Sequence, residues 1–130
     1  MAITEKRNTG DRGEEVACTF LVKHGYSIIE RNHWRKWGEI DIVALKNDEY
    51  HFVEVKTAIK DISRTPDLDF EYSPADNMTI EKRKRLSRVI QTYLTENRRG
   101  ECDWQVDLAL VYLDKNSNNF KIDMIDDIDL

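Results

Sequence analysis

The sequence predicts an α/β protein formed as a single domain over residues 1–130, with elements in the order helix, three strands, helix, two strands. A chain of this length suits one hydrophobic core. Two segments repeat apolar residues at helical spacing, and two β-branched, apolar-rich segments are joined by a short polar connection typical of a hairpin. The composition, 40% apolar and 35% charged, indicates a folded domain with a heavily charged surface.

The first predicted elements are a helix and a strand. The helix is expected to begin near Asp11, because Asp11 and Glu14 have the spacing of a capping box, in which each side chain bonds a backbone N–H at the helix start. Apolar residues then recur on one face, which includes Ala17 and Leu21, and Gly25 ends the helix. Residues 26–32 predict the first strand.

Residues 39–45 and 50–57 form the predicted hairpin, in a register that places Asp41 opposite Glu54 and Glu39 opposite Lys56. Two like charges directly across an antiparallel pair are destabilising unless something neutralises them, and a divalent cation does so. Alternation puts Glu54 and Lys56 on one strand face, about 6.6 Å apart. The pattern predicts a Mg²⁺ or Mn²⁺ site for phosphodiester chemistry; the alternative is an ion-pair network on a solvated sheet face.

The second half of the chain predicts a loop, a helix and two strands. Residues 59–78 contain both prolines and many acids and are expected to form a loop or flap. A helix is predicted at residues 79–97, followed by a buried strand at 106–113 that is almost continuously apolar. Residues 120–124 alternate and predict an edge strand, within an acidic C-terminal end at residues 114–130.

Charge is distributed unevenly along the chain. The net charge of -5 argues against bulk attraction to nucleic acid, but the second predicted helix carries a dense basic cluster. Trp34 and Trp37 flank a second basic pair, an arrangement suited to base stacking with phosphate contact. The alternatives are a solvated helix face and packing of the two indoles over the sheet edge. The residues expected to contact nucleic acid are Lys82, Arg83, Lys84, Arg88, Arg35 and Lys36.

Several of these motifs together match a known pattern. The run Gly38-Glu39-Ile40-Asp41, followed by Phe52-Val53-Glu54-Val55-Lys56-Thr57, resembles the core of the PD-(D/E)xK nuclease superfamily. With Gly10-Asp11-Arg12-Gly13-Glu14 and the pair Thr79 and Lys82, the chain is similar to the YraN-like family of uncharacterised bacterial proteins over about residues 10–113.

The resemblance implies a restriction-endonuclease-like core, a central mixed sheet of four to five strands flanked by helices. It implies that Asp41, Glu54 and the carbonyl of Val55 bind the metal, and that Lys56 is the catalytic lysine. By the same resemblance Glu14 lies near the metal and joins Asp41, Glu54 and Lys56 as a catalytic residue, whereas the capping box gives Glu14 a structural role instead.

The predicted function is metal-dependent hydrolysis of phosphodiester bonds in DNA, in preference to RNA, with branched or structured DNA among the candidate substrates. The alternative is a catalytically weak or inactive nuclease-fold module that binds nucleic acid or a protein partner. Ala58 favours this alternative, because it stands where YraN-like proteins often have an arginine, and so do the acids of the 59–78 loop. A homodimer is left open as a further partner.

A cytoplasmic location without a membrane partner is expected. No apolar run approaches the roughly 18 residues that suggest a membrane span, and the polar start lacks the apolar region of a signal peptide.

Overall fold

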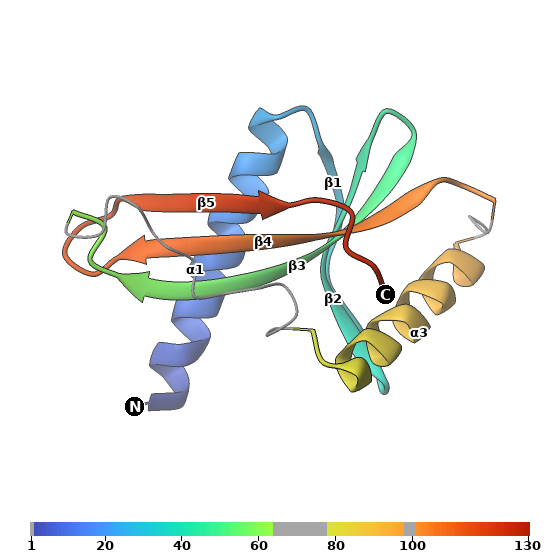
Figure 1. Cartoon of the computed structure of the whole chain (residues 1–130), viewed down its shortest axis with the longest axis horizontal. Helices are drawn as coiled ribbons and strands as arrows, with labels where there is room; N and C mark the ends of the chain where they lie inside the picture. The colour runs from blue at the N-terminus through green and yellow to red at the C-terminus, as the bar shows by residue number, and fades with distance from the viewer. Residues whose placement is uncertain (1, 64–77, 98–100) are drawn as a thin grey trace.

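The computed structural model describes residues 2–63, 78–97 and 101–130. Most of the predicted loop at 59–78, with all its acids except Asp61, lies outside these residues. One five-stranded sheet has the order β1-β2-β3-β4-β5 (Figure 1). This confirms the predicted α/β class, the mixed sheet and the element order. The elements are α1 (Ala2–Lys23), β1 (Ser27–Arg35), β2 (Gly38–Lys46), β3 (Glu49–Lys60), α3 (Ile80–Glu96), β4 (Trp104–Asp114) and β5 (Phe120–Ile125).

The sheet is mixed because its central pair is parallel. β1, β2 and β3 pair antiparallel in succession, β3 and β4 pair parallel, and β5 returns antiparallel to β4 as an edge strand. A parallel pair requires a crossover connection, and α3 lies within the crossover from β3 to β4. α1 packs mainly against β3 and β4 and α3 against β2, on opposite faces of the sheet (Figure 1).

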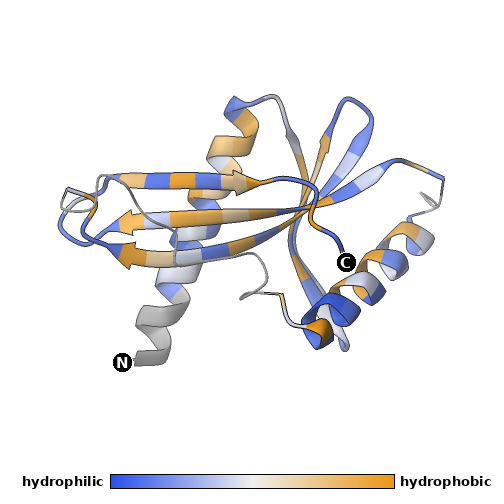
Figure 2. Cartoon of the chain, viewed as in Figure 1, coloured by the Kyte–Doolittle hydropathy of each residue, from blue (hydrophilic) through white to orange (hydrophobic). Residues whose placement is uncertain are grey.

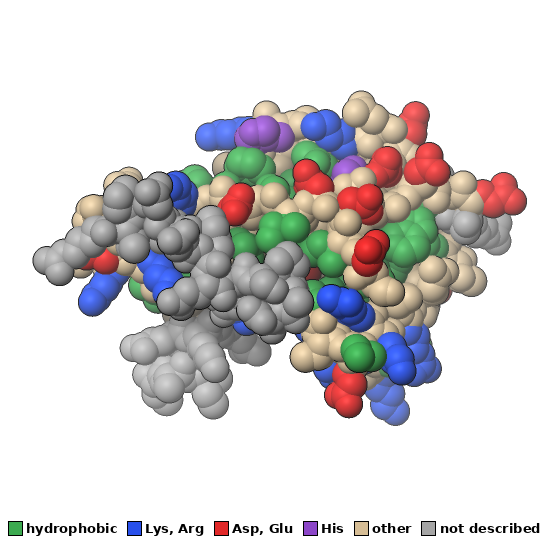
Figure 3. Space-filling model, viewed as in Figure 1, with side chains coloured by type: hydrophobic (Ala, Val, Ile, Leu, Met, Phe, Trp, Pro, Cys, Tyr) green, Lys and Arg blue, Asp and Glu red, His purple; other side chains and the backbone are tan. Residues whose placement is uncertain are grey.

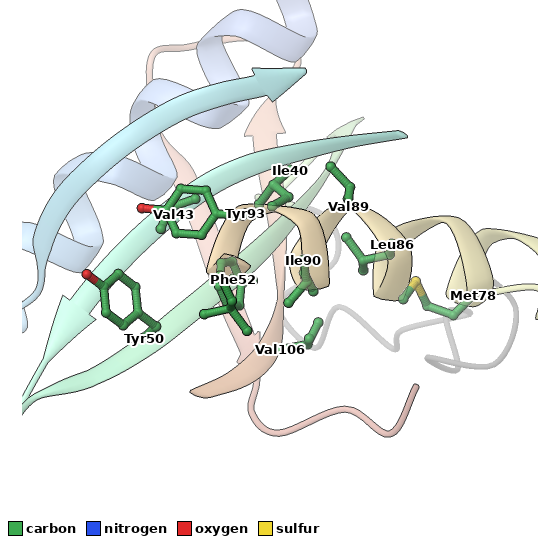
Figure 4. Packing of buried hydrophobic residues seen from close by; sticks show 11 residues of the cluster. Ile40, Val43, Tyr50, Phe52, Met78, Leu86, Val89, Ile90, Tyr93 and Val106 are labelled. Carbon is green, nitrogen blue, oxygen red and sulfur yellow. The ribbon is translucent and has the colours of Figure 1, made fainter. Parts of the chain in front are cut away.

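Each helix covers its own hydrophobic cluster. The α3 face contains Phe52, whose ring packs edge-to-face on Tyr93 with a centroid distance of 5.6 Å (Figure 4). The α1 face contains Val53, the next residue along β3, so alternation divides the strand between two cores. Figure 2 shows alternating bands of apolar and polar residues along the edge strand β5. Both faces of β3 therefore adjoin a hydrophobic cluster, which limits the space available to a charged side chain in this strand.

The predicted start of the first helix is wrong. α1 begins at Ala2, so Asp11 lies inside the helix and does not cap it. The stretch before Asp11 contains no proline and includes Ala2, Glu5, Lys6 and Arg7, which favour a helix, so the helix is not interrupted upstream of Asp11. The capping-box role of Glu14 is wrong for the same reason.

β1 and β3 run furthest beyond their predicted ends. β1 continues past residue 32 through Trp34 and Arg35, and β3 continues past residue 57 to Lys60. β2 and β3 form the predicted hairpin, and the turn between them consists of Asn47 and Asp48. Their φ angles of 51° and 61° are the left-handed values needed at both central positions of a type I′ turn. The tight turn extends the pairing of β2 and β3 by one residue each beyond the expected ends.

The second helix agrees with its prediction. Thr79 is the N-cap, accepting a hydrogen bond from the Lys82 N–H at 3.2 Å, and Asn97 is the C-cap. The buried side of α3 is formed by the expected apolar stripe, Leu86, Val89, Ile90, Tyr93 and Leu94. Neither helix in the described part of the chain combines the length and apolarity needed to cross a membrane.

The C-terminal segment after β5 turns back against the start of β4. The Asp127 N–H donates to Asp107 Oδ1 at 3.0 Å, and the Ile128 N–H donates to the Val106 carbonyl at 2.7 Å. Asp107 is fully buried and its other oxygen accepts from His51 Nδ1 at 2.8 Å. These bonds hold the acidic C-terminal end to the body of the sheet.

Candidate active site

β2 and β3 separate where the predicted acidic residues lie. Their antiparallel pairing reaches Ile42 and Val53, in the register expected from the hairpin, and ends one pair before Asp41 and Glu54. β3 instead continues parallel to β4 through its whole length. The two carboxylate-bearing positions therefore lie at a split in the sheet, and the direct strand pairing predicted for them is not formed.

The side chain of Asp41 replaces a backbone partner at this split. Asp41 Oδ2 accepts a hydrogen bond of 2.8 Å from the Val55 N–H, which β2 no longer reaches with a carbonyl. In an extended strand the N–H and C=O of one residue point to the same side. The Val55 carbonyl therefore faces the split beside Asp41, which places both predicted ligand groups at the same point.

Asp41 lies in a negative and partly desolvated environment. Burial, followed by the charges of Glu54, Glu39 and Glu14, raises the pKa of Asp41 to about 7, against the lowering effect of the Val55 N–H. Burial and the charges of Glu14 and Glu54 also raise the pKa of Glu39. Asp41 thus lies within electrostatic range of three other carboxylates, a condition that a cation would relieve.

Glu54 is held by a lysine from the other half of the chain. Lys82 Nζ lies 3.0 Å from Glu54 Oε1, and the Glu54 side chain is 16% exposed. Lys82 belongs to the first turn of α3, which the Thr79 cap fixes in position. Capping and the packing of α3 on β2 therefore bring a distant basic residue onto the predicted metal ligand.

Glu14 is buried and bonded to β1. Its Oε1 accepts from Arg31 Nε at 3.2 Å and from Asn32 Nδ2 at 2.9 Å. α1 comes close to the sheet here, since a Cβ on Gly13 would lie 1.8 Å from the Thr57 hydroxyl oxygen. The glycine therefore lets the helix approach β3 and brings Glu14 within electrostatic range of Asp41.

Asn32 has an unusual backbone for a residue within a strand. Its φ of 53° is left-handed, and it falls between the pairs Arg31 with Ile42 and His33 with Ile40, opposite Asp41. Asparagine tolerates this conformation better than most residues, and the Glu14 hydrogen bond fixes its side chain. Backbone strain of this kind concentrates near functional sites, so the distortion opposite Asp41 supports a functional site at this point of the sheet.

Lys56 occupies a less direct position than the other predicted residues. It pairs with Leu110 of β4, and alternation places it on the same face of β3 as Glu54. It is half-buried and is not among the side chains that line the pocket at the split. The structure thus brings Asp41, Glu54 and Lys82 together and leaves Lys56 adjacent to them.

A pocket of about 590 Å³ opens beside the carboxylates. Its lining includes two charged residues that were not predicted as site residues, Glu39 and Arg85. Glu39 belongs to the same motif as Asp41, and Arg85 is one helical turn from Lys82, so spacing offered a signal for both. The lining residues are Trp34, Arg35, Lys36, Trp37, Gly38, Glu39, Asp41, Glu54, Lys82, Arg85 and Leu86.

The basic helix divides its side chains between two places. Lys82 and Arg85 line the pocket at the split, whereas Arg83, Lys84 and Arg88 line a separate hollow of about 440 Å³ with Ile80, Ser87 and Leu130. Figure 3 shows Lys and Arg side chains gathered over α3 on this face. The predicted basic residues of α3 therefore form two groups.

Arg35 and Lys36, where β1 turns toward β2, also differ in their surroundings. Arg35 bonds the Glu96 carboxylate near the end of α3, with Nε 3.3 Å from Oε1, so part of its charge is neutralised. Lys36 is exposed at the turn and lines the pocket. Of this predicted pair, Lys36 is better placed than Arg35 to meet a phosphate.

The donor set fits a hard divalent cation that keeps most of its water. The described residues include no group of three or more His, Cys, Asp and Glu side chains placed to hold one ion together. Mg²⁺ typically takes one or two protein carboxylates and completes its shell with water and substrate phosphate. Asp41, Glu54 and the Val55 carbonyl meet that requirement, and among the described residues Asp41 has one hydrogen bond, which leaves its second oxygen for an ion.

Comparison with known proteins relates the chain to a large set of bacterial sequences. The model of the uncharacterised protein family UPF0102 matches residues 13–126. A UPF0102 protein of Caldicellulosiruptor saccharolyticus is 35% identical over 92% of this chain and 95% of its own length. UPF0102 proteins of Campylobacter hominis, 36% identical over 93% of each chain, and of Parabacteroides distasonis, 35% identical over 96% of this chain and 94% of its own, are similarly related.

Proposed function

The chain belongs to the uncharacterised protein family UPF0102, and we propose that it is a metal-dependent endonuclease that hydrolyses phosphodiester bonds of DNA. The membership confirms the YraN-like resemblance drawn from the motifs. One observation carries the proposal: partly buried Asp41 and Glu54 at the split between β2 and β3, with the pKa of Asp41 raised to about 7. Keeping two carboxylates together in such a place costs free energy, which a bound cation offsets.

The metal proposed for this site is Mg²⁺ or Mn²⁺, held by Asp41, Glu54 and the Val55 carbonyl. When bound, the ion polarises a phosphate oxygen and lowers the pKa of a coordinated water molecule. Glu14 supports the site indirectly, because its bonds to Arg31 and Asn32 hold β1 opposite Asp41.

The chain's basic residues supply the remaining chemistry. Lys56 follows Glu54 on the same face of β3, and its ammonium group is proposed to orient the attacking water or to stabilise charge that develops on the phosphate. Lys82 and Arg85 line the pocket from α3 and are proposed to bind the substrate phosphates. Lys82 can exchange its bond to Glu54 for a phosphate oxygen when a cation takes over the carboxylate.

A binding module without catalytic activity is the second candidate, and ion pairing favours it. Lys82 already neutralises Glu54, and Arg35 already neutralises Glu96 at the pocket's margin. By the YraN-like resemblance, Ala58 also stands where a basic side chain is expected. In this alternative the fold holds nucleic acid or a protein, and the carboxylates need no ion.

A cleavage assay separates the two functions. The purified protein is incubated with duplex, single-stranded, flap and four-way-junction DNA in Mg²⁺ or Mn²⁺, with Lys56→Ala and Asp41→Ala beside the wild type. Lys56→Ala should reduce cleavage by about 10²- to 10³-fold while metal and DNA affinity stay nearly intact, the scale of one lost electrostatic stabiliser. Asp41→Ala should lose metal binding and cleavage together.

Lys60→Ala, at the end of the same strand, is the matched control for the lysine variant and should cut like wild type. Cleavage that survives in both Asp41→Ala and Lys56→Ala would identify a contaminating nuclease. A wild-type protein that binds these DNAs and cuts none of them with either metal would replace the nuclease with the binding module.

A further inference from the structure

Trp34 is exposed beside the candidate active site. It is 65% exposed, although large aromatic side chains are usually well buried, and it lines the same pocket as Asp41, Glu54 and Lys82. An exposed indole at the wall of a charged pocket presents an aromatic face and an N–H donor together, the combination that makes tryptophan frequent at binding interfaces.

The local fold explains why this tryptophan differs from the others. His33 packs edge-to-face on Tyr93 of the α3 core, with ring centroids 5.1 Å apart, so alternation along β1 directs the next side chain, Trp34, away from that core. Trp37 packs against the core, and the Arg88 guanidinium lies 4.5 Å from its ring centroid. Trp104 also packs against the core, which leaves Trp34 as the indole available to a ligand.

Trp34 is close to the carboxylates. It is the cross-strand partner of Glu39, and partners in an antiparallel pair have Cβ atoms roughly 4.5 to 5.5 Å apart. Asp41 follows two residues after Glu39, about 6.6 Å along β2. A ligand stacked on the indole would therefore place its attached groups near Asp41.

The charge of the pocket limits how much affinity phosphates alone can contribute. Lys82 is paired with Glu54, Arg35 is paired with Glu96, and the net charge of the protein is -5. Base stacking on an aromatic side chain does not depend on net charge and is independent of base sequence. The combination of an open indole with a few basic side chains therefore suits a nucleotide whose base, as well as its phosphate, is recognised.

We propose that Trp34 is a stacking platform for an unpaired nucleobase, and that the substrate class of the site is DNA with a single-stranded segment. The proposal rests on the function proposed above. Inside a continuous duplex both faces of each base are covered by neighbouring bases, so the indole finds no face to stack on. A single strand, or the unpaired part of a flap or junction, offers that face with its phosphate directed toward Asp41.

Binding without cleavage tests this inference. The probe is a fluorescein-labelled 12-residue oligodeoxythymidylate, titrated in EDTA at low ionic strength and followed by anisotropy. Trp34→Ala should weaken binding by about 5- to 150-fold, the loss expected from one base–aromatic stack, whereas Trp34→Phe should retain most of the affinity. Phe120→Ala is the matched control, because Phe120 is an exposed aromatic residue on β5 that does not line the pocket.

An abasic oligonucleotide with the same phosphates separates stacking from charge. Wild type and Trp34→Ala should bind it equally. The proposal is overturned if wild type does not bind the oligothymidylate, if Trp34→Ala binds it like wild type, or if the variant loses affinity for the abasic strand to the same extent. Circular dichroism and thermal melting confirm that the Trp34 variants are folded.

Binding and cleavage measured together distinguish failure of the stacking platform from failure of the nuclease. Loss of binding in Trp34→Ala without any cleavage by wild type would support the stacking platform and remove the nuclease. Cleavage by wild type, together with unchanged binding and cleavage in Trp34→Ala, would support the nuclease and remove the stacking platform.

Discussion

Lys82 Nζ lies 3.0 Å from Glu54 Oε1, so a carboxylate proposed to bind metal already has a cationic partner. The ion pair connects the first turn of α3 with β3 at the point where β2 and β3 separate. A divalent ion at this site must compete with the lysine for the oxygen atoms of Glu54 or share them. The proposed binding of metal and the proposed binding of phosphate would therefore be linked through the Lys82 side chain.

Lys82→Ala should increase the affinity for Mn²⁺ by about 3- to 10-fold in the absence of DNA, because a partly exposed positive charge is removed from beside the ion. The same variant should bind DNA more weakly. Isothermal titration calorimetry measures the first effect. Lys84→Ala, an exposed lysine of the same helix outside this pocket, should change Mn²⁺ affinity little; equal effects of the two variants would contradict a specific role for Lys82.

The raised pKa of Asp41 predicts a pH-dependent stability. Its folded-state value of about 7 lies above the unfolded value of about 3.9, so the folded protein binds this proton more tightly. The resulting stabilisation is complete below about pH 4 and is lost as the pH rises through 7. In urea titrations without divalent ions, the free energy of unfolding of wild type should fall relative to that of Asp41→Asn across this window.

Divalent-ion affinity should show the opposite trend. The ion binds the ionised form of Asp41, so affinity should rise by up to about tenfold per pH unit below pH 7 and level off above it. Calorimetry at pH 6.5 in buffers of different ionisation enthalpy should detect protons released on binding. The same slope in Asp41→Asn would assign the titration to another group.

Gly13→Ala should destabilise the protein by about 1 to 3 kcal/mol, because the new Cβ would lie 1.8 Å from Thr57 Oγ1. Gly10→Ala, in the same helix with nothing within 4 Å of the added Cβ, should instead stabilise it by about 1 kcal/mol through helix propensity. Urea denaturation measures both. Thr57→Ala combined with Gly13→Ala should recover part of the loss, and strict additivity of the two changes would contradict a direct contact.

Replacing Arg83, Lys84 and Arg88 with alanine should weaken DNA binding for all sequences, if their hollow contacts phosphates. The slope of log affinity against log salt should flatten by about 0.7 to 0.9 for each lost contact. Anisotropy titrations over a range of salt concentrations measure it. If this triple variant keeps the wild-type slope, and a double variant carrying Lys36→Ala and Arg85→Ala has a reduced slope, phosphate binding is assigned to the pocket at the split instead.

The elements were predictable where short-range signals agreed with one another. Residues 79–97 carry an apolar stripe at helical spacing with Gly100 beyond its end, and α3 follows them within one residue at each end. The start of α1 was not predictable in this way, because the capping-box spacing of Asp11 and Glu14 indicated a helix start that the preceding residues do not follow. Glu14 was nevertheless expected near the site, and it interacts electrostatically with Asp41.

The sequence by itself determined the strand–turn–strand unit that carries Asp41 and Glu54, since turn residues and period-two alternation set register and faces locally. Only the tertiary structure decided that the strands separate one pair before the carboxylates, that Asp41 bonds the Val55 N–H, and that Lys82 meets Glu54. These contacts depend on sheet twist and on the approach of α3, which arise from packing between residues far apart in the chain. Spacing along the sequence therefore pointed to the two carboxylates proposed to bind metal, and packing selected which basic and aromatic side chains surround them.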